Sequence, residues 1–142
     1  MLLWTVSKKL ANKLTFILVI LFYSVGVNAE EDRRANLPVY IELQPAFVVN
    51  YLGYSDKLKY LKASITLRAS NIEGDTLVEA NLPLVRDGLV MYLSSLTVEQ
   101  VTGALAREES RKQAIAVLNE ILKEETGIEP ITDVLFTSFV TQ

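Results

Sequence analysis

The sequence predicts an α+β domain in which a small antiparallel sheet, made of a hairpin and a C-terminal strand, is covered by two helices. Two segments, residues 39–49 and 60–70, alternate apolar and polar side chains on either side of a turn. From about residue 75 to 124 the apolar residues change to helical spacing, and residues 131–142 return to alternation. The predicted order is therefore strand–strand–helix–helix–strand.

The chain begins with a cationic and then strongly apolar segment. Residues 14–27 (LTFILVILFYSVGV) carry no charge and follow Lys8, Lys9 and Lys13. A helix of that length spans about 21 Å, which is short of a hydrocarbon core about 30 Å thick. The pattern is typical of a signal peptide cut after Ala29. A retained transmembrane anchor that tilts or locally thins the bilayer is the alternative, and the sequence leaves both open.

Both interpretations give the same topology. The early lysines keep the N-terminus in the cytoplasm, so the chain from Glu30 onward is exported, which in a Gram-negative cell means the periplasm. Cleavage would leave a soluble periplasmic protein, whereas retention would leave a domain tethered to the inner membrane. We expect three parts: a leader or anchor (residues 1–29), a charged linker (30–37) and a folded domain (38–142).

The first predicted strand spans residues 39–49 and contains a proline. Pro45 cannot donate a hydrogen bond to a neighbouring strand, so it indicates an edge position or a bulge. Residues 60–70 (YLKASITLRAS) give the clearest strand pattern, with one buried and one wet face. The turn between these strands lies in residues 51–57, and the two form a predicted hairpin. The apolar positions of this hairpin are Val39, Ile41, Leu43, Phe47, Val49, Leu61, Ala63, Ile65, Leu67 and Ala69.

Two helices are predicted between the hairpin and the last strand. The first covers about residues 75–96, and Pro83 breaks or kinks it early, so that the helix proper could begin there. Its apolar positions are Leu77, Leu84, Val85, Leu89, Tyr92, Leu93 and Leu96.

The second predicted helix covers about residues 98–124. Thr97 and Gln100 form a capping-box pattern at its start, and Gly127 is placed to end it. Gly103 could separate its first turn from the rest. Its predicted buried stripe is Ala114, Ile115, Leu118, Ile121 and Leu122.

The final segment, residues 131–142 (ITDVLFTSFVTQ), has apolar residues on both faces. Strict alternation puts Val134, Phe136 and Val140 on one face, and Leu135 and Phe139 on the other. Because such a strand has little polar surface, we expect it to be an inner or well-covered strand.

Composition excludes several classes of function. The chain contains neither cysteine nor histidine, which removes thiol chemistry, thiolate metal sites and the commonest general base. Residues 1–29 hold three of the 14 Lys and Arg and no acid, so the rest carries 11 basic and 17 acidic residues, a net charge of −6. Such a domain is a poor partner for nucleic acid. Known catalytic and nucleotide-binding motifs are also absent, so we expect neither an enzyme nor a bound cofactor or metal.

Four groups of polar residues were considered as candidate sites. We interpret Ser94-Ser95 as helix-end chemistry, because no histidine is present to activate a serine. The three acids Glu120, Glu124 and Glu125 could hold a cation, but an exposed helix face is the simpler explanation.

The other two groups concern possible contacts. Arg86-Asp87 could be an interface contact, and a local salt bridge is the expectation we favour. The tyrosines Tyr51, Tyr54 and Tyr60 surround the predicted turn and could hold a ligand, but aromatic packing around a hairpin is the interpretation we favour. The sequence therefore assigns no catalytic, cofactor-binding or metal-binding residue.

Four stretches in series resemble the FliL family of flagellar basal-body-associated proteins. They are PVYIELQPAFVVN (38–50), YLKASITLRAS (60–70), LPLVRDGLVMYLSSLT (82–97) and DVLFTSFVTQ (133–142). The resemblance implies a stomatin-like (SPFH) domain in the periplasm behind one transmembrane helix. It also implies rings of copies around the stator units of the flagellar motor, which support rotation, chemotaxis and swarming.

The resemblance implies two partners, namely the peptidoglycan-binding subunit of the stator and further copies of this chain. The apolar run is shorter than the anchor usual in the family, which would fit a short, soluble paralogue. A different class of function, a periplasmic module that binds a ligand or an envelope polymer through the tyrosine-rich turn, stays as the alternative.

Overall fold

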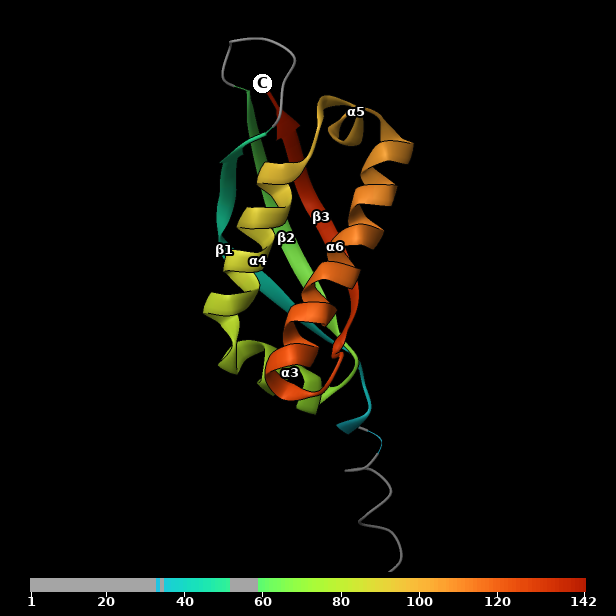
Figure 1. Ribbon diagram of the computed structural model, residues 1–142. Coiled ribbons are helices and arrows are strands. Elements are labelled where there is room, and N and C mark those ends of the chain that lie inside the picture. Colours follow the sequence, from blue (N-terminus) through green and yellow to red (C-terminus); the bar gives the residue numbers. More distant parts are fainter. Residues whose placement is uncertain (1–32, 34, 52–58) are drawn as a thin grey trace, which may run out of the picture. The chain divides into compact units, whose positions relative to one another are not determined.

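The computed structural model describes residue 33, residues 35–51 and residues 59–142. The predicted leader or anchor and the turn of the predicted hairpin lie outside these ranges. Residues 36–142 belong to one compact unit. Its elements, in order, are β1 (Val39–Asn50), β2 (Tyr60–Ala69), α3 (Ile72–Ala80), α4 (Leu82–Ser95), α5 (Val98–Val101), α6 (Ala104–Thr126) and β3 (Ile131–Thr141) (Figure 1).

The three strands form one antiparallel sheet in the order β1-β2-β3. In one row across the sheet, Leu43 pairs with Ile65 and Ile65 pairs with Phe136. The predicted α+β class and the predicted pairing of the first two strands are confirmed. The last strand was predicted to be inner or well covered. The inner position is wrong, because among the described strands β3 pairs with β2 alone and forms an edge of the sheet, although Ile131 and Val134 are buried.

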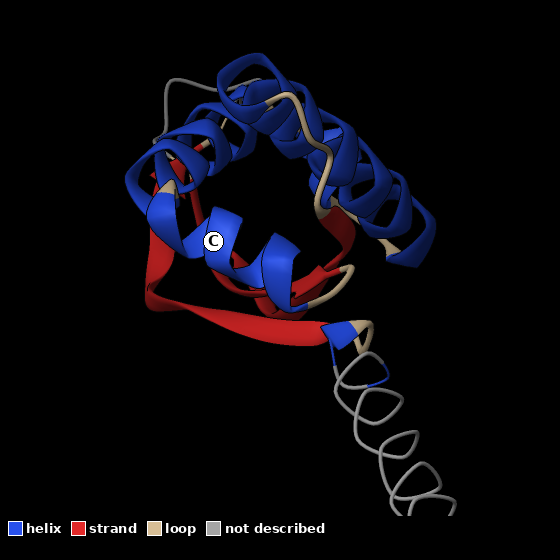
Figure 2. Cartoon of the chain, turned by 90° about the horizontal axis from the view of Figure 1, so that it is seen from below, coloured by secondary structure: helices blue, strands red, loops and turns tan. Residues whose placement is uncertain are grey.

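The core lies between one face of the sheet and the helices. Alternate residues of β1 and β2 are buried, and the predicted apolar positions of the hairpin, Val39 excepted, belong to this buried set. Figure 2 shows the strands on one side of the unit and the helices on the other. Among the described elements no helix covers the opposite face of the sheet, so this part of the chain forms a two-layer fold.

Pro45 marks both an edge strand and an irregularity. The pairing of β1 with β2 shifts between Leu43 and Phe47, and no other described strand pairs with β1. Proline is confined to such places because it lacks the N–H that a central strand needs. The interpretation of Pro45 as an edge residue or a bulge is confirmed.

The described residues contain four helices where the sequence predicted two. The first predicted helix divides at Asn81, because Pro83 lies in the first turn of α4 and cannot continue the hydrogen bonds of α3. The second divides at Gly103, whose φ of 92° lies outside the helical region. The predicted capping box of Thr97 and Gln100 is present at the start of α5, and Gly127 ends α6 in the left-handed conformation.

None of the helices in the described part of the chain combines the length and the apolar character that crossing a bilayer requires.

Candidate functional site

The polar groups singled out as possible catalytic or metal sites have structural surroundings. Ser95 Oγ donates to the carbonyl of Tyr92, 2.7 Å away, and so serves the end of α4. Glu120, Glu124 and Glu125 are exposed on α6. Within the described ranges, no three acidic side chains come close enough together to hold a metal ion.

Arg86 does not form the expected salt bridge with Asp87. Its guanidinium donates to the carbonyls of Gln44 and Pro45, at 3.3 and 3.0 Å, and lies 4.4 Å from the centroid of the Phe47 ring. Among the described residues the Arg86 side chain has no carboxylate partner. Arg86 therefore ties α4 to the irregular part of β1 and satisfies two of its carbonyl groups.

The two described tyrosines of the turn region lie on opposite faces of the sheet. Tyr51 is buried in the core, whereas Tyr60 is 45% exposed on the open face. Tyr54, which completes the group, falls outside the described residues. Tyr51 and Tyr60 thus do not converge on a common ligand.

The outer edge of β3 is closed along its first half by side chains. Asn119 of α6 donates to the carbonyl of Ile131 at 2.7 Å, and the Ile131 amide donates back to Asn119 Oδ1 at 3.0 Å. The amide of Val134 donates to Asp133 Oδ1 at 2.8 Å, and Arg111 of α6 pairs with the same carboxylate. In this way α6 and Asp133 satisfy backbone groups that would otherwise face solvent.

The second half of the same edge is open. Tyr60 and Gln142 donate to each other's carbonyls, at 3.0 and 2.9 Å, and so form a hydrogen-bonded pair. This pair determines which residues of β3 direct their backbone groups toward β2 and which direct them away. In the observed pairing of β2 with β3, the backbone groups of Phe136, Phe139 and Thr141 then point away from β2. Within the described ranges no hydrogen-bond partner meets these outward groups.

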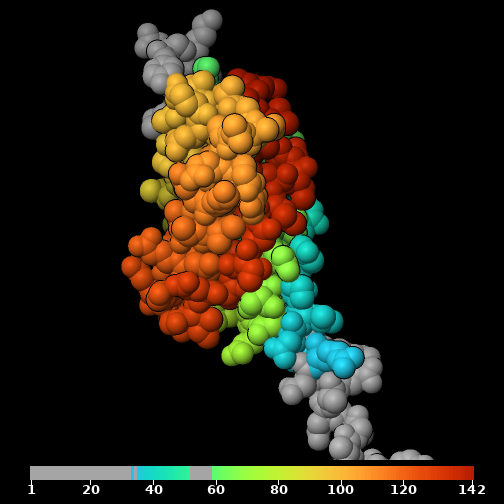
Figure 3. Space-filling view, turned by 90° about the vertical axis from the view of Figure 1, so that its right-hand side faces the viewer, coloured from blue at the N-terminus to red at the C-terminus, as the bar shows by residue number. Residues whose placement is uncertain are grey.

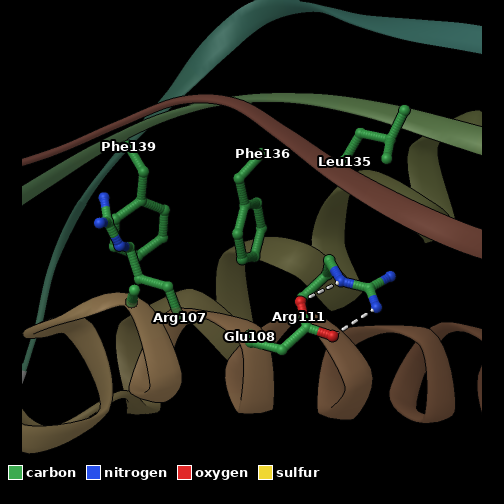
Figure 4. Close-up of a pocket in the computed structure, with 7 residues that line it drawn as sticks. Arg107, Glu108, Arg111, Leu135, Phe136 and Phe139 are labelled. Carbon is green, nitrogen blue, oxygen red and sulfur yellow. Dashed lines mark hydrogen bonds and ion pairs between the residues drawn. The ribbon is translucent and has the colours of Figure 1, made fainter.

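A groove with an estimated volume of about 350 Å³ runs beside this open half, between α6 and β3. Figure 3 shows α6 and β3 side by side on this face. The rings of Phe136 and Phe139 extend from β3 toward α6, with Arg107 beside Phe139 (Figure 4). The two ring centroids lie 5.0 Å apart. The lining residues are Ala104, Arg107, Glu108, Arg111, Leu135, Phe136 and Phe139.

The charges of this groove divide into a paired group and one available cation. Arg111 binds Glu108 through two bonds, from Nε at 2.8 Å and from Nη2 at 2.7 Å, and also contacts Asp133. The hydrogen bond from Arg111 holds the pKa of Glu108 below its usual value, and Glu108 in turn raises the pKa of Arg111. Arg107 donates only to the carbonyl of Gly103 and has no carboxylate partner in the described part of the chain.

A second groove lies on the helical layer, between α4 and α6. Met91 is 67% exposed there, and Asp87 and Glu124 provide acidic groups at its lining. Its floor is narrow because the two helices approach closely at Gly88. This surface is apolar, but it offers no open backbone edge.

The sequence did not predict the groove beside β3. Strict alternation put Phe136 and Phe139 on opposite faces, whereas the register shift between Ser64 and Ile65 brings both rings to the same side. The apolar residues on both faces of the last strand were the available signal, and it was interpreted as burial.

Most of the chain is similar to known proteins. The family described as "Flagellar basal body-associated protein FliL" matches residues 40–142, which run from β1 through β3. The chain is also 31% identical over 101 residues to a protein named "Flagellar protein FliL" from Aquifex aeolicus (strain VF5). That match covers 71% of this chain and 60% of the Aquifex protein.

Proposed function

Because the chain belongs to the FliL family of flagellar basal body-associated proteins, we propose that it is a non-catalytic accessory protein of the bacterial flagellar motor. The observation that carries the proposal is the extent of the family match, which includes all strands of the sheet and the helices that cover it. The family's description refers to association with the basal body, and the lack of cysteine and histidine agrees with a binding role.

In this role the domain would lie next to stator units, assemble with further copies of itself into a ring and support rotation under load, chemotaxis and swarming. The proposed location is the periplasmic side of the inner membrane, with the N-terminus in the cytoplasm. A stomatin-like arrangement of the domain belongs to the same proposal.

A clean deletion tests the motor role, in a flagellated host without a second family member. We expect cells that still carry flagella, visible by electron microscopy, but swarm poorly and rotate slowly under load. Wild-type chain should restore swarming, and a chain with the core substitution Ile65→Asp should not. Normal swimming and swarming in the deletion strain would contradict the proposal.

The membrane attachment needs a separate measurement, namely the mass of the mature protein after cell fractionation. A start at Glu30 in the soluble periplasmic fraction indicates a cleaved leader, whereas a chain that retains residues 1–29 in the membrane fraction indicates an anchor. A reporter enzyme fused after Gln142 and active only in the cytosol would overturn the periplasmic location itself.

A further inference from the structure

We propose that the open half of the β3 edge binds an extended segment of another protein, which adds a strand to the sheet. The segment would carry an apolar side chain that enters the groove at Phe136 and Phe139, and an acidic side chain that pairs with Arg107. The inference goes beyond the motor role because it assigns a docking surface and the chemistry of its partner.

The first argument is the contrast within one strand. Asn119 satisfies both outward backbone groups of Ile131, and Asp133 accepts from the outward N–H of Val134. The outward groups of Phe136, Phe139 and Thr141 have no partner among the described residues. Proteins usually block free strand edges because such edges recruit other chains. An edge blocked only along the first half of one strand indicates that the second half is available for pairing.

The opposite edge of the sheet supports this assignment. In β1, Pro45 supplies no N–H, the pairing is irregular, and Arg86 occupies the carbonyls of Gln44 and Pro45. These are the usual obstacles to strand addition. Of the two edges in the described unit, β3 is therefore the better template.

The second argument is the groove beside the open edge. Its rings provide an apolar contact for a side chain of the added strand, and backbone pairing together with side-chain pockets is how strand-adding domains obtain affinity and selectivity. Arg107 is the cation of this groove that no described carboxylate neutralises. An acidic side chain two residues from the apolar one lies on the same side of an extended chain and can pair with Arg107.

The shape of the site favours one extended chain over a second copy of the whole domain. α6 lies near the start of β3 and diverges from it toward Ala104, so that its first half stands beside the open edge (Figure 1). Arg111 pairs with Asp133 in the closed first half of β3. The edge of another sheet would bring its own helical layer against this half of α6, whereas a single strand avoids that contact.

The probe for this site is an eight-residue peptide of alternating threonine and valine, with one central leucine and an aspartate two residues after it. The full-length chain in detergent micelles is titrated with it, and amide hydrogen exchange is followed residue by residue. We expect exchange at Phe136, Phe139 and Thr141 to slow at least tenfold at saturation. The amides of Tyr40 and Glu42 on β1 should not change.

Matched variants distinguish specific binding of the peptide from nonspecific association. Arg107→Glu should weaken binding about fivefold, whereas Lys112→Glu, a charge reversal on the same helix outside the groove, should change it less than twofold. Methylating every second amide nitrogen of the peptide removes its donors along one edge and should weaken binding at least tenfold. Thr141→Pro should weaken it and Thr141→Ala should not, because only proline removes the outward N–H.

Three results would overturn the proposal. The first is an absence of protection at millimolar peptide, and the second is protection that survives amide methylation. The third is slowed exchange at Phe139 and Thr141 without peptide that grows with protein concentration, because it would assign the edge to a second copy.

Discussion

At the scale of single residues, Arg86 shows how one side chain determines the shape of a distant strand. It contacts the carbonyls of Gln44 and Pro45 from a position 42 and 41 residues further along the chain. Its guanidinium also lies over Phe47, which belongs to the core. The Arg86 side chain thus stabilises the irregular segment of β1 through hydrogen bonds and a cation–π contact at the same time.

We predict that Arg86→Ala lowers the free energy of unfolding by about 2 kcal/mol, because two carbonyls lose a charged donor and Phe47 loses its cation. Arg86→Lys should recover only part of this loss, since a single ammonium cannot reproduce the planar fork. The control Asp87→Ala removes an exposed carboxylate and should change stability by less than about 0.5 kcal/mol. Denaturant titration followed by circular dichroism measures all three. Equal losses of unfolding free energy for Arg86→Ala and Asp87→Ala would contradict this prediction and favour a local salt bridge between Arg86 and Asp87.

Ile65 gives the corresponding prediction for the core. It is 1% exposed in the central strand, so Ile65→Asp places an unpaired charge among apolar side chains. We expect a loss of about 4 kcal/mol, which is enough to unfold a domain of ordinary stability. Lys62→Asp, on the open face of the same strand, should fold normally. A folded Ile65→Asp variant with native circular dichroism would contradict the strand register.

Local patterns were predictable at this scale because the residues that form them lie close together in the sequence. The alternation around Ile65, the capping box of Thr97 and Gln100, and Gly127 each depend on residues within a few positions of one another. The role of Arg86 was not predictable, because its acceptors are backbone carbonyls that carry no sequence signal. A charged neighbour such as Asp87 then makes a salt bridge seem the simplest expectation.

At the scale of elements, the points where the helices divide could be recognised from the sequence. The contacts that hold the helices together could not. Pro83 and Gly103 mark the divisions, and both were recognisable. The close approach of α4 and α6 depends on Gly88, which is buried and was not singled out. Glycine inside a helix gives no indication of which other helix it faces, so this contact could not be predicted.

A double substitution tests the α4–α6 contact. A methyl group at Gly88 would lie 2.5 Å from Ile121 Cδ1, so Gly88→Ala must displace that atom. We expect Gly88→Ala to lower stability by about 1 kcal/mol, because overpacking outweighs the better helix propensity of alanine. Ile121→Val deletes Cδ1 itself.

The pair Gly88→Ala/Ile121→Val should therefore be more stable than the sum of the single changes predicts, by at least about 1 kcal/mol. The double-mutant cycle is measured by denaturant titration. Ile115→Val, on the same helix away from Gly88, serves as the control and should be additive with Gly88→Ala. Additivity in both cycles would show that the two helices do not meet at Gly88.

At the scale of the whole molecule, the arrangement of the sheet follows from pairings between distant parts of the chain. Ile65 pairs with Phe136, and Thr137 donates to the carbonyl of Ser64, 73 residues away. The strand type of residues 131–142 was predictable from alternation, but the side of the sheet on which the strand lies was not. Its apolar residues were assigned to an inner or well-covered strand. The structure buries Ile131 and Val134, and it uses Leu135, Phe136 and Phe139 to line a groove at an edge.

The two halves of that edge should differ in protection from hydrogen exchange. In the free protein we expect slow exchange at Ile131, whose amide donates to Asn119, and fast exchange at the outward amides of Phe139 and Thr141. Asn119→Ala removes both bonds to Ile131 and should raise the exchange rate of its amide at least tenfold, with a loss of about 1 kcal/mol in stability. Glu120→Ala, an exposed change next to it, should leave both quantities unaltered.

This comparison determines whether the second half of the β3 edge is accessible in solution. If Phe139 and Thr141 exchange as slowly as Ile131 at every protein concentration, an intramolecular partner covers the whole strand and the edge is not available for docking. If Asn119→Ala accelerates exchange at Ile131 alone, α6 blocks only the start of β3. The rest of the β3 edge is then free for pairing, because α6 diverges from it. The arrangement of this helix and this strand, more than any single residue, then determines where another chain can bind.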